Sequence, residues 1–181
     1  MKQEEFNITE TLAGDEIIPT RLPVLPLRDV VIFPYMIYPV LLGRESSLKA
    51  AQHAIERDKF VFVVSQKNPA VEDPTKEDVY LDGTVAKIVQ TMKIPNGLMK
   101  ILVDGVRQAS IRSFVENQNF LEAEIVVSKQ HHEDSSEIDA LARHVTTLFV
   151  EFVHINRNLG GEVLKTFESI TDTERKLFFV A

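Results

Sequence analysis

The sequence feature that most constrains the fold is a turn signal between two apolar runs. Residues 84–91 and 98–103 have the composition of β-strands, and Pro95-Asn96-Gly97 lies between them. Proline presets the backbone of the first turn position, and Asn-Gly supplies the left-handed conformation that a tight turn needs. The pattern predicts a β-hairpin with residues 94–98 at its tip.

The sequence around this hairpin predicts further strands. Residues 22–27 are apolar but contain two prolines, which cannot donate to a ladder, so we expect an edge strand or a bulged strand. Residues 60–64 form a continuous apolar run, typical of a buried central strand. Residues 109–114 and 121–127 indicate two more strands, and Gly105 is expected to end the strand that precedes them.

The pattern of apolar residues predicts helices in two places. Within the strand-rich region, residues 46–58 place Leu48, Ala51, Ala54 and Ile55 on one face, with Ser46-Ser47 capping the start. After Lys129 a polar run suits a linker. Helical periodicity then predicts a helix over residues 137–156, and Thr171 with Glu174 three residues later predicts the cap of another.

These elements predict an α+β chain in three parts. Residues 1–20 are expected to be a flexible lead-in. Residues 21–128 form a β-rich domain with one helix. Residues 129–181 form a helical subdomain, which we interpret as truncated at its C-terminus because Leu177 and the apolar residues after it directly follow a helix start.

Composition disfavours several classes of function. The net charge of -7 argues against nucleic acid and against anionic membrane surfaces as partners. The chain has no cysteine, which excludes disulfides, zinc–cysteine sites and thiol catalysis. Its start lacks a signal peptide, and no run approaches the roughly 18 apolar residues of a membrane span. We expect a cytoplasmic protein.

Motif searches identify no catalytic, cofactor-binding or metal-binding residues. The seven glycines form no phosphate-binding loop, no serine lies in a Gly-x-Ser-x-Gly pattern, and the five histidines lack paired ligand spacing. The enzyme hypothesis therefore has no residue to support it.

Two apolar clusters are candidates for a binding surface. One lies between Pro34 and Pro39, and the other lies in the predicted hairpin, where about half of the side chains should leave the core. Flexible methionines on an exposed face suit recognition of varied partners, although a core position is the alternative for each residue. The candidates are Tyr35, Met36, Tyr38, Met92, Ile94, Pro95, Leu98 and Met99.

Several segments resemble the N-domains of Lon-type ATP-dependent proteases. Residues 22–34 (LPVLPLRDVVIFP) are similar to the opening motif, and residues 39–47, 83–86 and 95–105 continue the similarity. The resemblance implies a PUA-like β-barrel followed by a helical subdomain. In the parent enzyme, an ATPase module that uses ATP and Mg²⁺ and a serine–lysine protease module are expected elsewhere, because neither motif occurs in this chain.

The resemblance also implies a role. It predicts a non-catalytic region that recognises unfolded or degron-bearing proteins and supports a hexamer of Lon subunits. Binding by one domain is expected to be micromolar or weaker, since six copies would add avidity. Two alternatives remain. One is an oligomerisation module in which the helix over residues 137–156 and the helix that begins at Thr171 pack between subunits. The other is an RNA-binding PUA-like domain, which the acidic charge disfavours.

Overall fold

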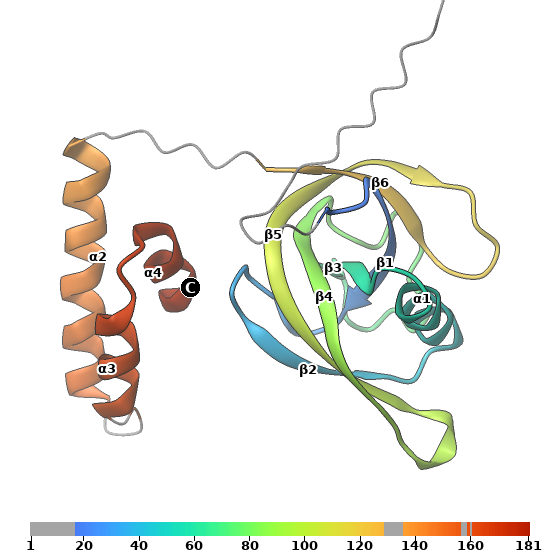
Figure 1. Ribbon diagram of the computed structural model, residues 1–181, viewed down its shortest axis with the longest axis horizontal. Coiled ribbons are helices and arrows are strands. Elements are labelled where there is room, and N and C mark those ends of the chain that lie inside the picture. Colours follow the sequence, from blue (N-terminus) through green and yellow to red (C-terminus); the bar gives the residue numbers. More distant parts are fainter. Residues whose placement is uncertain (1–16, 129–135, 157–158, 160) are drawn as a thin grey trace, which may run out of the picture. The chain divides into compact units, whose positions relative to one another are not determined.

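The computed structural model describes residues 17–128, 136–156, 159 and 161–181, and shows an α+β protein (Figure 1). The chain divides into two compact units, Met1–Ser128 and Lys129–Ala181. Most of the predicted lead-in and of the predicted linker lies outside the described residues. Ile18 is buried at 2% exposure, so ordered packing begins before Arg21, where we had expected it to start.

The first unit is built on a closed sheet. Its elements are β1 (Arg21–Leu27), β2 (Ile37–Leu42), α1 (Glu45–Ile55), β3 (Phe60–Ser65), β4 (Asp82–Lys93), the 3₁₀ turn η1 (Pro95–Gly97), β5 (Met99–Val115) and β6 (Glu122–Val127). The strand order is β2-β5-β4-β3-β1-β6, and β5 also pairs with β6. Five strands therefore form a ring, and β2 is added to β5 outside it.

Strand β3 explains how the core is divided. Val61 and Val63 belong to one apolar cluster, which includes the alanines of α1. Phe62 and Val64 belong to a second cluster with strands β1, β4, β5 and β6. Both faces of β3 are therefore buried, which confirms the central strand predicted from its continuous apolar run.

Strand β1 is not an edge strand, so that alternative of the prediction was wrong. It pairs with β6 through Arg21–Pro23 and with β3 through residues 24–27. The two halves of the strand have different partners. Pro23 lies in the half that pairs with β6, and Pro26 lies in the half that pairs with β3. Because each half has one partner strand, the missing N–H of a proline costs less stability there than in a strand paired on both sides.

Strand β5 passes through Gly105 without a break, so the predicted strand end there was also wrong. A Cβ atom on Gly105 would overlap the Phe33 carbonyl oxygen and lie 3.0 Å from the Phe33 carbonyl carbon. The turn over residues 33–36 instead binds the glycine directly: Tyr35 N–H donates to Gly105 O (2.6 Å), and Gly105 N–H donates to Met36 O (2.9 Å). The glycine is required for close backbone approach.

Helix α1 confirms the predicted apolar face but not the predicted cap. Ala51 and Ala54 are buried, and Leu48 and Ile55 pack against the same core cluster. The N-cap residue is Arg44, and no side chain caps the helix; Ser46 and Ser47 lie inside its first turn.

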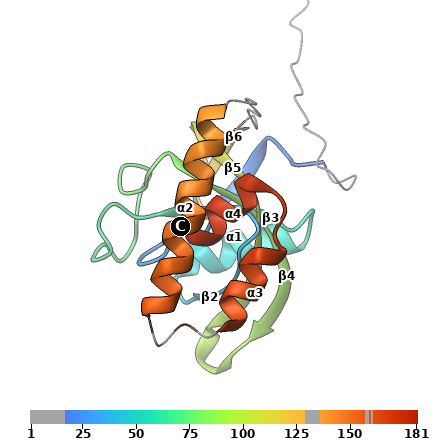
Figure 2. The same ribbon diagram turned by 90° about the vertical axis from the view of Figure 1, so that its left-hand side faces the viewer.

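The second unit contains α2 (Ser136–Ile155), α3 (Gly161–Ser169) and α4 (Thr173–Val180) (Figure 2). Helix α2 confirms the helix predicted over residues 137–156. Phe167 is buried between Phe149 and Phe179, at ring-centroid distances of 4.6 and 5.9 Å. The cap of α4 is Asp172, whose carboxylate accepts from Arg175 N–H at 2.7 Å, one residue after the predicted Thr171.

Candidate functional site

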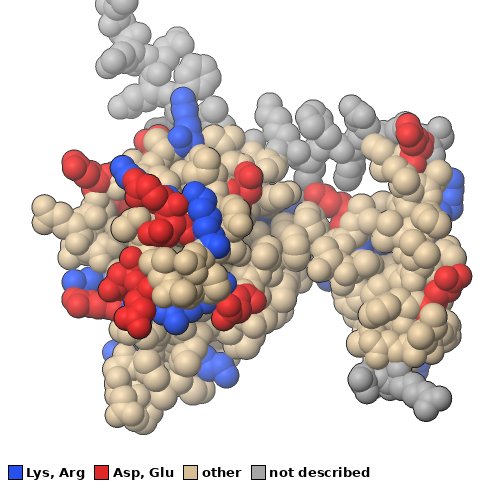
Figure 3. Space-filling model, turned by 180° about the vertical axis from the view of Figure 1, so that it is seen from behind, with Lys and Arg blue, Asp and Glu red and all other residues tan. Residues whose placement is uncertain are grey.

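The β4–β5 hairpin projects from the first unit (Figure 1). Asn96 and Gly97 have φ values of 71° and 76°, which confirms the predicted left-handed turn. Residues 89–93 are exposed on both faces of the strand, because they extend past the core. Figure 3 shows the projecting end of the hairpin as largely uncharged, with acidic and basic side chains gathered on the body of the same unit.

Three neighbouring strands present an outer face beside this hairpin in which apolar side chains are interspersed with polar ones. Exposed Lys100 lies between Leu41 and Met92, Gln90 lies opposite Leu102, and Asp104 lies opposite Ile37. The strand register places Leu41 opposite Lys100, and Lys100 opposite Met92, and residues opposite one another share a face of the sheet. Ile37 and Leu41 are 62% and 61% exposed, and Met92 is 55% exposed. We define the outer strand face by its apolar members, which are Ile37, Pro39, Leu41, Met92 and Leu102.

The structure separates the predicted binding residues by burial. Tyr35, Met92 and Pro95 are exposed; Met36, Tyr38, Ile94 and Leu98 are half-buried. Met99 is only 8% exposed and belongs to the core, so we correct its assignment to the binding surface. Met36 and Tyr38 also pack against that core cluster.

Ile37 and Leu41 were missed by the sequence analysis. Alternation along β2 was the available signal, since side chains two residues apart share a face. Val40 and Leu42 are buried, so the odd-numbered neighbours must point outward. The sequence alone did not reveal which of the two sets faces the core.

Tyr35 lies on a well-anchored turn. Its φ is 66°, a conformation that non-glycine residues seldom adopt, and the turn is bonded to Gly105 on β5. Its hydroxyl accepts a hydrogen bond from Arg107 Nη1 at 3.3 Å. Tyr35, which is 40% exposed, is therefore held near the start of β2.

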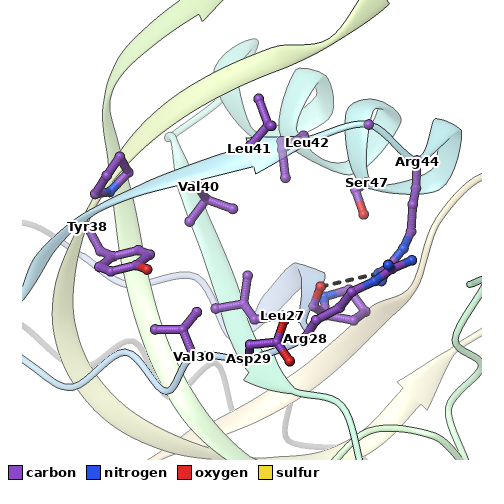
Figure 4. A pocket seen from close by; sticks show the side chains of 13 residues that line it. Leu27, Arg28, Asp29, Val30, Tyr38, Val40, Leu41, Leu42, Arg44 and Ser47 are labelled. Carbon is purple, nitrogen blue, oxygen red and sulfur yellow. Dashed lines mark hydrogen bonds between the residues drawn. The ribbon is translucent and has the colours of Figure 1, made fainter. Parts of the chain in front are cut away.

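A groove runs along β2 (Figure 4). It has a volume of about 530 Å³ and lies between residues 26–30 and residues 38–44, within the size range of ligand sites. Val30, Tyr38 and Val40 provide apolar walls. Figure 4 shows Arg28 and Arg44 at the end of the groove away from Tyr38.

Arg44 is held in place at that end. Its Nη1 donates to Pro26 O at 3.4 Å, and its Nη2 donates to Gln66 Oε1 at 2.5 Å. Burial lowers the pKa of Arg44, and the positive charge of Arg28 lowers it further, while Asp73 acts in the opposite direction. Two guanidinium groups therefore lie near one another at this end of the groove, with Asp29 also in the lining.

A second perturbed ionisable group is structural. Arg21 forms a bidentate pair with Glu122 across β1 and β6, at 2.7 and 2.8 Å. This pair, together with a hydrogen bond from Asn117, lowers the pKa of Glu122 although burial opposes the shift. The pair joins strands that close the ring and lines none of the surfaces described above.

Helix α2 carries a second exposed apolar surface, in the other unit. Its residues follow one another at alternating spacings of three and four, the pattern of a coiled-coil seam. Helices α3 and α4 cover the part of α2 where Val153 is buried, and Val145 lies at its border, where it lines a pocket with Phe167 and Leu177. We define the α2 seam as Ile138, Leu141, Val145, Leu148, Phe152 and Ile155, of which all but Val145 are exposed.

The described residues do not gather the side chains that a metal centre would need. Among residues 17–128, 136–156, 159 and 161–181, no group of three His, Asp or Glu side chains is placed to hold an ion. In the same part of the chain, no helix combines the length and apolar character needed to cross a bilayer.

Comparison with known proteins identifies the family. A family model described as the ATP-dependent protease La (LON) substrate-binding domain matches residues 21–181. The chain belongs to the Lon substrate-binding domain family. It is 40% identical over 150 residues to the Lon protease of Azospirillum brasilense, and 39% identical over 155 residues to that of Halothermothrix orenii. These matches cover 83% and 85% of this chain.

The chain spans only 18% and 20% of the length of these two Lon proteases. Solved structures agree on the fold. The N-terminal domain of Mycobacterium avium complex Lon protease matches with a TM-score of 0.62 at 19% identity, covering 88% of this chain and 95% of that chain. The Lon N-terminal domain protein from Xanthomonas campestris matches with a TM-score of 0.53 at 15% identity, covering 87% and 95%.

Proposed function

We propose that this Lon substrate-binding domain is a non-catalytic recognition region that engages unfolded or degron-bearing proteins in the cytoplasm through its exposed apolar surface. The outer strand face carries the proposal, together with exposed Tyr35 and Pro95. Hydrolysis of ATP with Mg²⁺ and cleavage of the substrate are assigned to other parts of the Lon enzyme.

The outer strand face has the properties that such a receptor needs. Unfolded proteins expose apolar segments, so a receptor requires accessible apolar area and tolerance of varied sequences. Met92 supplies a flexible side chain near the tip of a projecting hairpin, and Ile37 and Leu41 extend the apolar area across β2. Half-buried Ile94 and Leu98 add area at the tip.

Titration with a permanently unfolded protein tests this role. The probe is a reduced, carboxymethylated globular protein, compared with its native parent, and binding is followed by NMR chemical shifts of the 181-residue chain. Shifts should occur only with the unfolded probe and should include the outer strand face. A Leu41→Ser, Met92→Ser double variant should weaken binding by about tenfold, as expected for loss of buried apolar contacts.

Val126→Ser is the matched control. Val126 is similarly exposed, at 54%, but lies on β6, so its replacement should leave binding unchanged. Equal weakening by both variants, or equal shifts with the native parent, would contradict recognition through the outer strand face.

Support of Lon assembly is a second proposed role, favoured by the α2 seam. Five exposed apolar side chains at coiled-coil spacing are costly in water and suit packing against a helix of another subunit. Leu148→Glu should reduce any concentration-dependent association seen by analytical ultracentrifugation, whereas Thr147→Glu, on a neighbouring exposed position, should not. A chain that stays monomeric at high concentration would argue against this role for the isolated region.

A further inference from the structure

Strand β2 has one free edge in the described part of the chain. It pairs only with β5, whereas the ring closes through the pairing of β5 with β6. The groove of Figure 4 runs along the other side of β2 and is lined by residues 38–42 in succession. Consecutive residues point to opposite faces of a strand, so a groove that touches all of them follows the backbone edge.

The hydrogen-bond pattern identifies which backbone groups face this edge. Gly105 N–H donates to Met36 O, and the register pairs Tyr38 with Val103 and Val40 with Ile101 without interruption. In an antiparallel pair, hydrogen-bonded residues alternate along the strand, so the even-numbered residues bond to β5. The peptide groups of Pro39 and Leu41 therefore face the groove, and that of Ile37 faces the same edge just before the lining begins at Tyr38. A proline is tolerated on such an edge.

The opposite wall of the groove is held at a fixed position. Ser65 Oγ donates to Val30 O at 3.0 Å, and Arg44 Nη1 donates to Pro26 O. These bonds attach residues 26–30 to β3 and to the start of α1. The groove is thus a preformed slot beside an unpaired strand edge.

The charge of the slot is asymmetric. Arg28 and Arg44 lie at the end reached by the C-terminal end of β2, and neither forms a salt bridge within the described residues. Asp29 also lines the slot, and Asp73 acts on Arg44 from nearby. Apolar walls followed by two guanidinium groups match an apolar chain that ends in a carboxylate.

We propose that the free edge of β2 binds an extended polypeptide segment as an added parallel strand, with the α-carboxylate of its C-terminal residue beside Arg28 and Arg44. Main-chain hydrogen bonds to Ile37 and Leu41 supply sequence-tolerant affinity, as in other cases of strand addition. The proposal rests on the proposed function, because it names a binding mode for the same class of substrate. The outer strand face adjoins this edge through the side chains of β2.

Three peptides test the proposal by fluorescence anisotropy with the 181-residue chain. The probe is a short labelled peptide of alternating valine and threonine with a free C-terminal carboxylate. The second peptide is amidated at its C-terminus, and the third is N-methylated at alternate backbone nitrogens. Amidation should weaken binding roughly three- to tenfold because one partly exposed ion pair is lost. N-methylation should weaken it about tenfold or more because strand hydrogen bonds are lost.

Matched variants separate the backbone edge from the side chains. Ile37→Pro removes an edge N–H and should abolish binding of the first peptide, whereas Ile37→Ala should retain most of it. Arg28→Ala should remove the difference in affinity between the peptide with a free carboxylate and the amidated peptide. Arg57→Ala, an exposed arginine after α1, should leave that difference intact.

Several outcomes would overturn the proposal. Equal affinity for the N-methylated peptide would exclude strand addition, and equal affinity for acid and amide would exclude the carboxylate site. A protein dimer that Ile37→Pro abolishes, with no peptide bound, would show that a second copy occupies the edge. The two proposals can fail separately. If the Leu41→Ser, Met92→Ser variant binds the unfolded protein more weakly than the unmodified chain does, but none of the peptides binds, strand addition is wrong and the proposed function stands.

Discussion

Replacement of Gly105 by alanine tests the packing that holds the start of β2. The residue lies where β5 meets the turn over residues 33–36, and its backbone N–H and C=O groups both bond to that turn. An added Cβ would overlap the carbonyl oxygen of Phe33. Because the obstacle is backbone rather than the end of a side chain, the turn must move as a unit.

The expected cost follows from this geometry. Overpacking in a well-packed site costs about 1–3 kcal/mol, and displacement of the turn also weakens the two hydrogen bonds at Gly105, worth about 1 kcal/mol each. We therefore expect Gly105→Ala to reduce the free energy of unfolding by about 2–4 kcal/mol. The displaced turn should also move Tyr35 away from Arg107.

Tyrosine fluorescence during urea unfolding measures this loss of stability in the first unit of the chain, where Gly105 lies. The chain has no tryptophan and three tyrosines, Tyr35, Tyr38 and Tyr80, all within the first unit. With a urea dependence of about 1–3 kcal/mol per M, the midpoint should fall by roughly 1–2 M with little change in slope.

Gly43→Ala is the matched control. A Cβ there would meet only Leu98 Cδ2, at 3.0 Å, and the end of a side chain can move at small cost. Its midpoint should shift by less than about a third as much as that of Gly105→Ala. If Gly105→Ala, Gly43→Ala and the unmodified chain all unfold at the same urea concentration, the close approach of the turn to β5 is refuted.

Two further predictions concern stability. The pKa of Glu122 is lowered in the folded chain, so its stabilisation is present above the ordinary carboxyl pKa and is lost as pH falls through the lowered value. Glu122→Gln should therefore cost about 1–2 kcal/mol near pH 7 and little in strong acid, measured by the same fluorescence; an unchanged pH profile would contradict this. Phe167→Ala should remove about 3–5 kcal/mol from the helical unit, so helical far-UV signal should unfold earlier while the tyrosine transition is retained.

Much of the local structure could be predicted because its signals are local. The hairpin turn depends on Asn96 and Gly97 adopting left-handed backbone, which their side chains permit. Helix α2 follows from apolar spacing within its own 20 residues. The caps of α1 and α4 were misplaced by one or two residues, since several polar residues near a helix start satisfy the same pattern.

The candidate site was predicted only in part. The sequence identified the hairpin and the segment around Tyr35 as apolar and unusual, and Met92 and Tyr35 are indeed exposed. It did not separate Met99, which is buried, from Met92, its near neighbour across the hairpin. Met99 shares a face of the sheet with buried Leu42, whereas Met92 shares the opposite face with exposed Lys100. The sequence of the hairpin does not show which of its faces covers the core.

The sequence by itself determined the hairpin, most of the other strands, helices α1 and α2, and the family to which the chain belongs; it did not predict β2 or α3. Only the tertiary structure decided that β1 is interior, that β5 continues through Gly105, and that β2 has a free edge with Ile37 and Leu41 facing outward. These properties depend on register between strands that lie far apart in the chain, as β1 and β6 do, where Arg21 pairs with Glu124. A one-residue change in that register would reverse the face of every side chain, whereas local propensity would be unchanged.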